Sequence, residues 1–265
     1  MIAYLAGLGM LGPGLLDGQQ GLAALASAEL LGAALRAPVA TGLSPNEARR
    51  CPASARYALD VGMQALSAAG WDAACVATVL SSGSGDLEIL DKNCRALTQT
   101  PAVLSPTLFH NSVHNAAGGY WGIATHSRAP TTSLSAYDAS FAAGLLEALT
   151  TLPARRTCLL MAYDLPAPAA LASVRKVVAP FAVALALCAE PPRQSPLARL
   201  DWRWQPRSGA TETAMPVTER EALRQGNPAA RALPLLEAIA KRRPTTVVWP
   251  CPRAGELQAE LSFLD

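Results

Sequence analysis

Two kinds of hydrophobic pattern alternate along this chain: short, continuously apolar runs, and longer stretches in which apolar residues recur every three or four positions. The apolar runs predict strands at 2–8, 76–81, 131–136, 157–162, 181–188, 200–204, 245–249 and 256–263. The helical spacing predicts helices at 21–35, 53–69, 86–97, 111–125, 138–150, 167–174 and 227–241. Residues 205–225 are polar and unpatterned, so we expect a loop there. Strands that alternate with helices predict a layered α/β architecture.

Residues at the ends of these segments support the predicted helices. Gly70 follows the helix at 53–69, where a C-terminal glycine is expected. Asn227 stands directly before Pro228, which places a capping side chain ahead of a proline at the first helical position. Asp138 is expected to cap the helix that follows it.

Composition excludes several classes of protein. Half of the 265 residues are apolar, 16% are charged, and the net charge of +2 is too small to indicate nucleic acid binding. Six dispersed cysteines without a C-x-x-C pair suit free thiols in a reducing compartment. The apolar N-terminus lacks a basic region, and no run reaches the ~20 apolar residues that span a bilayer. We therefore expect a cytoplasmic protein with no membrane span.

Basic residues are unevenly distributed. None precedes Arg36, and they are comparatively frequent between Arg175 and Arg243. A basic face could receive an acidic partner, although an ordinary solvated surface is the better explanation from charge alone.

A glycine motif near the N-terminus resembles a dinucleotide-binding turn. Gly7, Gly9 and Gly12 fit G-x-G-x-x-G after a strand, and Glu29 lies at a suitable distance for a ribose contact. Pro13 follows at once, however, and removes an amide where a helix should open toward a pyrophosphate. Glu29 falls within a helical pattern and not at a strand end. We therefore expect no nucleotide site.

The junction between the predicted strand at 131–136 and the next helix is where a nucleophile could be presented. It reads Ser135-Ala-Tyr-Asp-Ala-Ser140. Asp138 is a poor acyl nucleophile, so Ser140 is the alternative. His110 and His114, four residues apart, could serve it as a base. With no acidic residue between them, they are not spaced as metal ligands, and a structural role for them is more common.

Several segments together resemble the thiolase-fold β-ketoacyl synthases. Residues 3–14 resemble the opening strand and glycine turn of that family, residues 129–138 the strand that leads into the catalytic cysteine, and residues 180–187 the strand that closes the N-terminal half. In this resemblance Asp138 occupies the position of the cysteine. Ketosynthases also use histidines from their C-terminal half, whereas this chain has no histidine after His126. The resemblance thus implies that ketosynthase catalysis is lost.

Closer still is the resemblance to short ketosynthase-like proteins of aryl polyene and related pigment pathways, often described as chain length factors. It extends over nearly the whole chain through segments at 105–116, 140–148, 162–164 and 227–236. It implies a thiolase-like layered fold in which helices sandwich a mixed β-sheet, truncated relative to full ketosynthases. A single domain over 1–265 would comprise an N-terminal-half-like core at 1–190 and a reduced C-terminal part at 191–265.

The same resemblance implies a non-catalytic subunit that pairs with an active β-ketoacyl-acyl carrier protein synthase and meets acyl carrier protein transiently, without cofactor or metal. Aromatic residues near the interface would then limit acyl length, although each also suits core packing: Phe109, Tyr120, Trp121, Tyr137 and Phe141. An acyltransferase or thioesterase that uses Ser140 with His110 or His114 is the alternative function. A homodimeric scaffold is a third.

Overall fold

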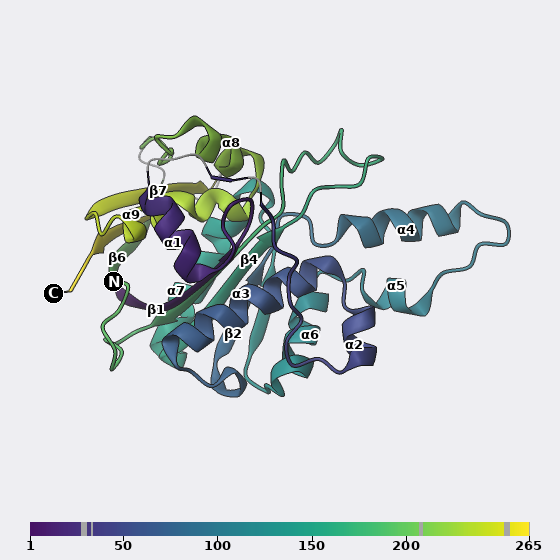
Figure 1. Cartoon of the computed structure of the whole chain (residues 1–265), viewed down its shortest axis with the longest axis horizontal. Helices are drawn as coiled ribbons and strands as arrows, with labels where there is room; N and C mark the ends of the chain where they lie inside the picture. Colours follow the sequence, from purple (N-terminus) through teal and green to yellow (C-terminus); the bar gives the residue numbers. More distant parts are fainter. Residues whose placement is uncertain (28–30, 33, 207–208, 252–254, 265) are drawn as a thin grey trace.

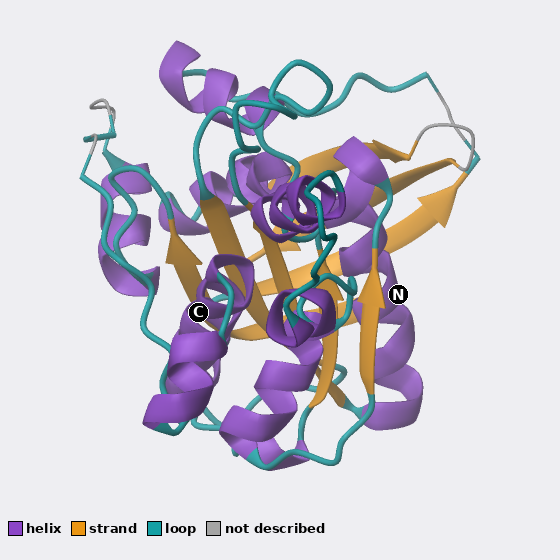
Figure 2. Ribbon diagram, turned by 90° about the vertical axis from the view of Figure 1, so that its right-hand side faces the viewer, coloured by secondary structure: helices purple, strands orange, loops and turns teal. Residues whose placement is uncertain are grey.

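The computed structural model describes residues 1–27, 31–32, 34–206, 209–251 and 255–264. Within these ranges a mixed eight-stranded sheet runs through the molecule in the order β3-β2-β4-β5-β1-β6-β8-β7. Helices cover both faces of the sheet (Figures 1 and 2). The strands are β1 (Ile2–Leu11), β2 (Ala77–Ser81), β3 (Thr131–Leu134), β4 (Thr157–Asp164), β5 (Phe181–Cys188), β6 (Ala198–Gln205), β7 (Thr245–Cys251) and β8 (Gly255–Ser262).

Strand direction divides the sheet. β2 lies parallel to both β3 and β4, and every other neighbouring pair is antiparallel. β2 and β5 are buried along their whole length, which explains why their sequences are continuously apolar. β6 alternates between buried and more exposed positions over most of its length, as expected for a strand that is covered more fully on one face.

The helices lie in two layers. α3 and α6 pack on one face of the sheet, and α7, α1 and α9 on the other. The helices are α1 (Gly18–Ala26), α2 (Pro45–Arg50), α3 (Ala53–Ala69), α4 (Leu87–Leu97), α5 (Pro106–His110), α6 (Ala116–Thr125), α7 (Ser140–Arg155), α8 (Thr218–Gly226) and α9 (Leu233–Ala240), with 3-10 turns η1 (Ala73–Cys75), η2 (Tyr137–Ala139) and η3 (Ala229–Ala232). The expected layered architecture, with helices on both sides of a mixed sheet, is confirmed.

The N-terminal glycines serve packing. A Cβ at Gly9 would lie 2.1 Å from the carbonyl oxygen of Val61, and one at Gly7 would lie 2.1 Å from that of Ala65. These glycines are inside β1, so they let α3 approach the central strand closely and form no phosphate-binding turn. Glu29, the residue considered for a ribose contact, lies outside the described residues.

Elements with a strong local signal match their predictions. α3 spans 53–69 and β5 spans 181–188, as predicted. Gly70 adopts φ 68° and closes α3, while the amide of Trp71 donates to the carbonyl of Leu66 in a Schellman-type end. Asn227 accepts from the amides of Ala229 and Ala230, but the single helix predicted over 227–241 is divided into the 3-10 turn η3 and the helix α9.

The boundaries of two predicted helices were wrong. The helix expected at 21–35 begins earlier, at Gly18 after the capping residue Asp17, and α1 ends at Ala26. The helix expected at 111–125 begins only at Ala116, because the preceding residues form the separate helix α5 and a turn. Residues 28–30 and 33, which fall within the first of these predictions, lie outside the described residues.

Two further segments differ in kind. The helix expected at 167–174 is a series of turns in the structure. The loop expected at 205–225 contains α8, whose buried face includes Arg220 and Arg224 beside Leu223. Arginines on the inner face hid this helix from a search for apolar spacing.

A helical arm projects from the body. α4 and α5 extend away from the sheet together (Figure 1). Only Ile89 and Asn93 of α4 are buried, whereas Leu90 and Leu97 of the same helix are exposed. No helix in the described part of the chain is long and apolar enough to cross a membrane.

Candidate functional site

The junction between β3 and α7 has an unusual backbone. β3 ends at Leu134, and Tyr137 adopts φ 55°, a left-handed conformation that is rare for a bulky residue. α7 begins at Ser140 with Ala139 at the N-cap and no capping side chain. The prediction that Asp138 caps this helix was wrong, because its carboxylate is engaged by an arginine from another loop.

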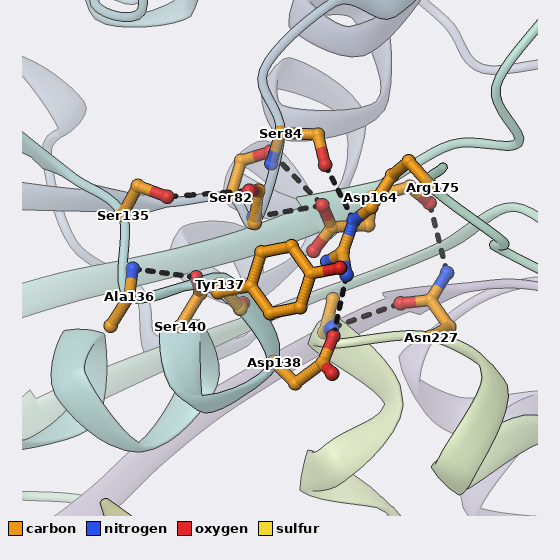
Figure 3. A network of polar contacts seen from close by, with 12 residues as sticks. Ser82, Ser84, Ser135, Ala136, Tyr137, Asp138, Ser140, Asp164, Arg175 and Asn227 are labelled. Atoms are coloured by element: carbon orange, nitrogen blue, oxygen red, sulfur yellow. Dashed lines mark hydrogen bonds and ion pairs between the residues drawn. The ribbon is translucent and has the colours of Figure 1, made fainter. Parts of the chain in front are cut away.

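That arginine is Arg175, from the segment between β4 and β5 (Figure 3). Its Nη1 lies 2.6 Å from Oδ1 of Asp138, and its Nε donates to Ser84 Oγ at 2.7 Å. Its Cζ lies 4.0 Å from the centre of the Tyr137 ring, a cation–π contact. The side chain of Arg175 is 9% exposed and that of Asp138 is 54% exposed. The pair therefore stands at a surface, with its cation inside and its anion outside.

The contacts of Arg175 favour its charged form. Burial by itself would lower the pKa of Arg175, but its contacts with Asp138 and Tyr137 raise that pKa above the ordinary value. The Asp138 carboxylate thus has a permanent cation beside it. A carboxylate held in this way has no means of forming the thioester that an acyl-transferring cysteine forms.

A second carboxylate lies deeper. Asp164, at the end of β4, is almost fully buried, and its Oδ1 accepts from the Gly83 amide at 2.8 Å and from Ser82 Oγ at 3.1 Å. Burial raises the pKa of Asp164 to about 7. Asn227 donates to the carbonyls of Asp164 and Ala179. Segments far apart in the sequence are joined at this point (Figure 3).

Ser140 is placed differently from what a nucleophile requires. It is buried; its Oγ donates to the carbonyl of Tyr137 at 2.7 Å and accepts from the amide of Ala136 at 2.9 Å. His114 Nε2 lies 3.2 Å from the carbonyl of Ser82. His110 ends α5 beside a hollow at the surface. In the hydrogen bonds of the described residues, neither histidine pairs with Ser140.

The five aromatic candidates divide into two groups. Tyr120, Trp121 and Phe141 are buried; Phe141 packs against Trp249 with ring centres 5.7 Å apart. Phe109 and Tyr137 are exposed, by 61% and 59%. Of the five candidates, only these two offer large apolar area to a partner in the isolated chain.

Two surface hollows lie near these residues. One, of about 530 Å³, is formed by α2, α5 and α6 and is lined by His110, Val113, Tyr120 and Ile123 among others. The other, of about 480 Å³, lies beside Asp138 and is bounded by Glu212, Arg231 and Pro250. The first hollow therefore contains two residues singled out from the sequence, His110 and Tyr120, and the second contains one, Asp138.

Sequence reasoning missed Arg175, Ser84 and the role of Asp164. Arg175 lies in a segment without periodicity, 37 residues from its partner Asp138. Asp164 carried a signal, since a carboxylate at the end of a continuously apolar strand must find hydrogen bonds.

The chain is similar in fold to several solved structures. No curated protein matches this chain. Among solved structures, the complex of a ketosynthase (ApeO) with its chain length factor (ApeC) from Xenorhabdus doucetiae matches with 24% identity and a TM-score of 0.70 over 99% of both chains. The ishigamide ketosynthase/chain length factor matches with 14% identity and a TM-score of 0.71 over the whole of both chains.

A third match is the type II polyketide synthase assembly AntDE:AntF, described as an acyl-carrier protein in complex with its ketosynthase bound to the hexaketide. Its identity is 12% and its TM-score 0.74, over 99% of both chains. At these identities the likeness shows a shared fold, the thiolase-like ketosynthase fold in a short form. The family described as β-ketoacyl synthase, N-terminal domain, matches residues 26–249, most of the chain. This chain therefore belongs to the family described as β-ketoacyl synthase, N-terminal domain.

Proposed function

We propose that this chain is a non-catalytic ketosynthase-like subunit, a chain length factor, that pairs with an active β-ketoacyl-acyl carrier protein synthase in polyene or fatty-acid-like chain elongation. One observation carries the proposal. The residue at the expected nucleophile position, Asp138, is a carboxylate in an ion pair with Arg175. The chain also has no histidine after His126 to promote decarboxylation of an extender unit.

An open sheet edge supports association with another subunit. β3 ends the sheet and pairs only with β2 among the described strands, while Thr131 and Thr132 are exposed. An unpaired edge strand is a ready template for a strand of another chain. The hollow over α5 and α6 has exposed apolar residues in its lining, Val113 and Ile123. An edge and an apolar hollow together suit a protein partner.

The structural relatives support the kind of partner. Two of them are complexes of a ketosynthase with a chain length factor, and a third contains a ketosynthase with its acyl carrier protein. By analogy, the partner of this chain is a catalytic ketosynthase, and acyl carrier protein visits the pair. The chain would act beside that ketosynthase in the cytoplasm, where six free cysteines stay reduced.

Three arginines of the second half contribute little free charge for acyl carrier protein. Arg224 and Arg231 both pair with Glu212, and Arg220 forms a buried pair with Glu237 at 2.9 Å. Because these arginines are neutralised within the fold, we propose that docking of acyl carrier protein does not depend on them.

Co-expression with the ketosynthase encoded beside this chain tests the proposal. A stable 1:1 complex in size-exclusion chromatography with light scattering is expected. Ile123→Asp on α6 should abolish it, and Thr246→Asp on β7, at the opposite edge of the sheet, should not. Separate elution of the two proteins would contradict the proposal.

Incubation of this chain alone with acyl carrier protein thioesters tests its catalytic status. Intact mass spectrometry should show neither an acyl adduct nor hydrolysis. An adduct at Ser140 would instead support the acyltransferase or thioesterase alternative.

A further inference from the structure

Tyr137 combines exposure with a fixed conformation. Its ring is 59% exposed, yet its backbone holds φ 55°. A left-handed conformation is unfavourable for a bulky side chain and persists only where neighbouring groups enforce it. Such positions gather at functional sites, so the contacts that hold Tyr137 indicate its role.

Both the backbone and the ring of Tyr137 are held. The Tyr137 carbonyl accepts from Ser140 Oγ at 2.7 Å, which closes the turn. The guanidinium of Arg175 lies 4.0 Å from the ring centre and is itself fixed at two atoms, by Asp138 and by Ser84 (Figure 3). The ring therefore stacks on a buried, anchored cation and is held against the protein while much of it faces solvent.

Core packing does not account for this arrangement. A buried arginine and a left-handed tyrosine are both unfavourable by themselves, and burying the ring would remove more apolar area from water than leaving it at the surface. The arrangement instead fixes the position of an exposed aromatic ring. Rigid tyrosines at the centre of protein interfaces contribute strongly to affinity, since little side-chain freedom is lost when the partner binds.

The surroundings of Tyr137 indicate what covers the ring. It follows β3, the open edge of the sheet, by three residues. Ser135 Oγ donates to the Gly83 carbonyl, and His114 contacts the Ser82 carbonyl, so the same surface continues to the start of α6. A partner that reaches the ring therefore also meets an unpaired strand edge. A protein that itself presents a strand edge beside an apolar pocket satisfies both requirements.

We propose that Tyr137 is a preorganised anchor for the ketosynthase subunit and that Arg175, held by Asp138, is the positioning residue that orients it. The inference rests on the proposed pairing with a ketosynthase. It gives the aspartate at the cysteine position a present role: Asp138 holds the cation on which the anchor rests.

Affinity measurements with the co-expressed ketosynthase, separated and recombined, test the inference. Tyr137→Ala should weaken binding at least 10-fold, as expected for a central aromatic anchor. Arg175→Lys keeps the charge but cannot bond Ser84 and Asp138 at once or stack a planar group on the ring, and should weaken binding about 3-fold or more. Ile2→Ala, an exposed apolar residue on β1, four strands away from β3 in the sheet, should leave binding unchanged.

A double-mutant cycle separates positioning from general stability. If Arg175 acts through Tyr137, adding Arg175→Lys to Tyr137→Ala should cause no further loss of affinity. Thermal unfolding of each variant identifies any that are unfolded at the binding temperature. If Arg175→Lys is unfolded, Ser84→Ala replaces it in the cycle.

The outcomes are distinct. Wild-type chain that does not bind the ketosynthase overturns the proposed function and this inference with it. Wild-type binding that Tyr137→Ala leaves within twofold overturns the inference alone, as do fully additive losses in the cycle. Self-association of the chain that Tyr137→Ala abolishes would assign the anchor to a second copy and would also overturn the inference.

Discussion

Restoring a cysteine at position 138 tests how far this chain has departed from a ketosynthase. We expect Asp138→Cys to destabilise the protein and to restore no condensation. The substitution removes the carboxylate 2.6 Å from Arg175 and leaves a mostly buried guanidinium with Ser84 and the Tyr137 ring as its remaining contacts. Breaking a fully buried pair costs about 3–5 kcal/mol, and an exposed pair contributes about 0–1 kcal/mol.

Asp138 is about half exposed and Arg175 is not, so a loss of roughly 1–3 kcal/mol is expected between these limits. In a chain of this size that corresponds to a fall in Tm of about 3–10 °C. Urea unfolding of wild type, Asp138→Cys and Asp138→Asn measures the loss, and pairing Asp138→Cys with Arg175→Met should recover part of it. Equal stability of wild type and Asp138→Cys, within about 0.5 kcal/mol, would refute the ion-pair argument. Condensation by the cysteine variant without a partner would refute the account of lost catalysis.

Three further predictions concern the fold. Gly9→Ala places a Cβ against Val61 and should cost about 1–3 kcal/mol or more in urea unfolding. Gly119→Ala, with open space at its Cβ, should be neutral or slightly stabilising. Equal effects of the two substitutions on the free energy of unfolding would contradict the packing argument. Glu237→Ala removes a buried carboxylate 2.9 Å from Arg220 and should cost about 3–5 kcal/mol, a value that a loss under 1 kcal/mol would refute. Because the folded-state pKa of Asp164 is about 7, against an ordinary value of 3.8, its contribution is fully present below pH 3.8 and is lost as pH rises through 7. Wild type should therefore lose on the order of 4 kcal/mol between pH 4 and pH 8 relative to Asp164→Asn, and parallel curves of unfolding free energy against pH for the two proteins would contradict this assignment.

Local signals account for the parts of the fold that were predictable. The helix α3 combines regular apolar spacing with Gly70 at its end, and β5 is an unbroken apolar run that is buried on both faces. The ends of such segments can be read from the sequence, because burial on one side of a helix or on both sides of a strand requires apolar residues at the buried positions. The sheet order carried no comparable signal.

The missed elements depend on partners distant in the sequence. Arg220 on α8 is buried because Glu237 and the carbonyls at the end of α1 receive it, and none of these is near it in sequence. Resemblance to a known family located Asp138 at the nucleophile position. Its ion pair could not be predicted, because Arg175 is 37 residues away in sequence. Arg175 can be recognised as the partner of Asp138 only after folding brings its loop to the junction between β3 and α7.

The place of β1 in the sheet has a consequence for synthesis. β1 leaves the ribosome long before its two neighbours in the sheet, since β5 begins at Phe181 and β6 at Ala198, and Ile2 pairs with Asp201. At roughly 5–20 residues per second, translation leaves this apolar strand without its sheet neighbours for some ten to forty seconds. The nascent chain thus exposes its future central strand throughout elongation. A chaperone that binds this strand as it emerges should therefore raise the yield of folded protein.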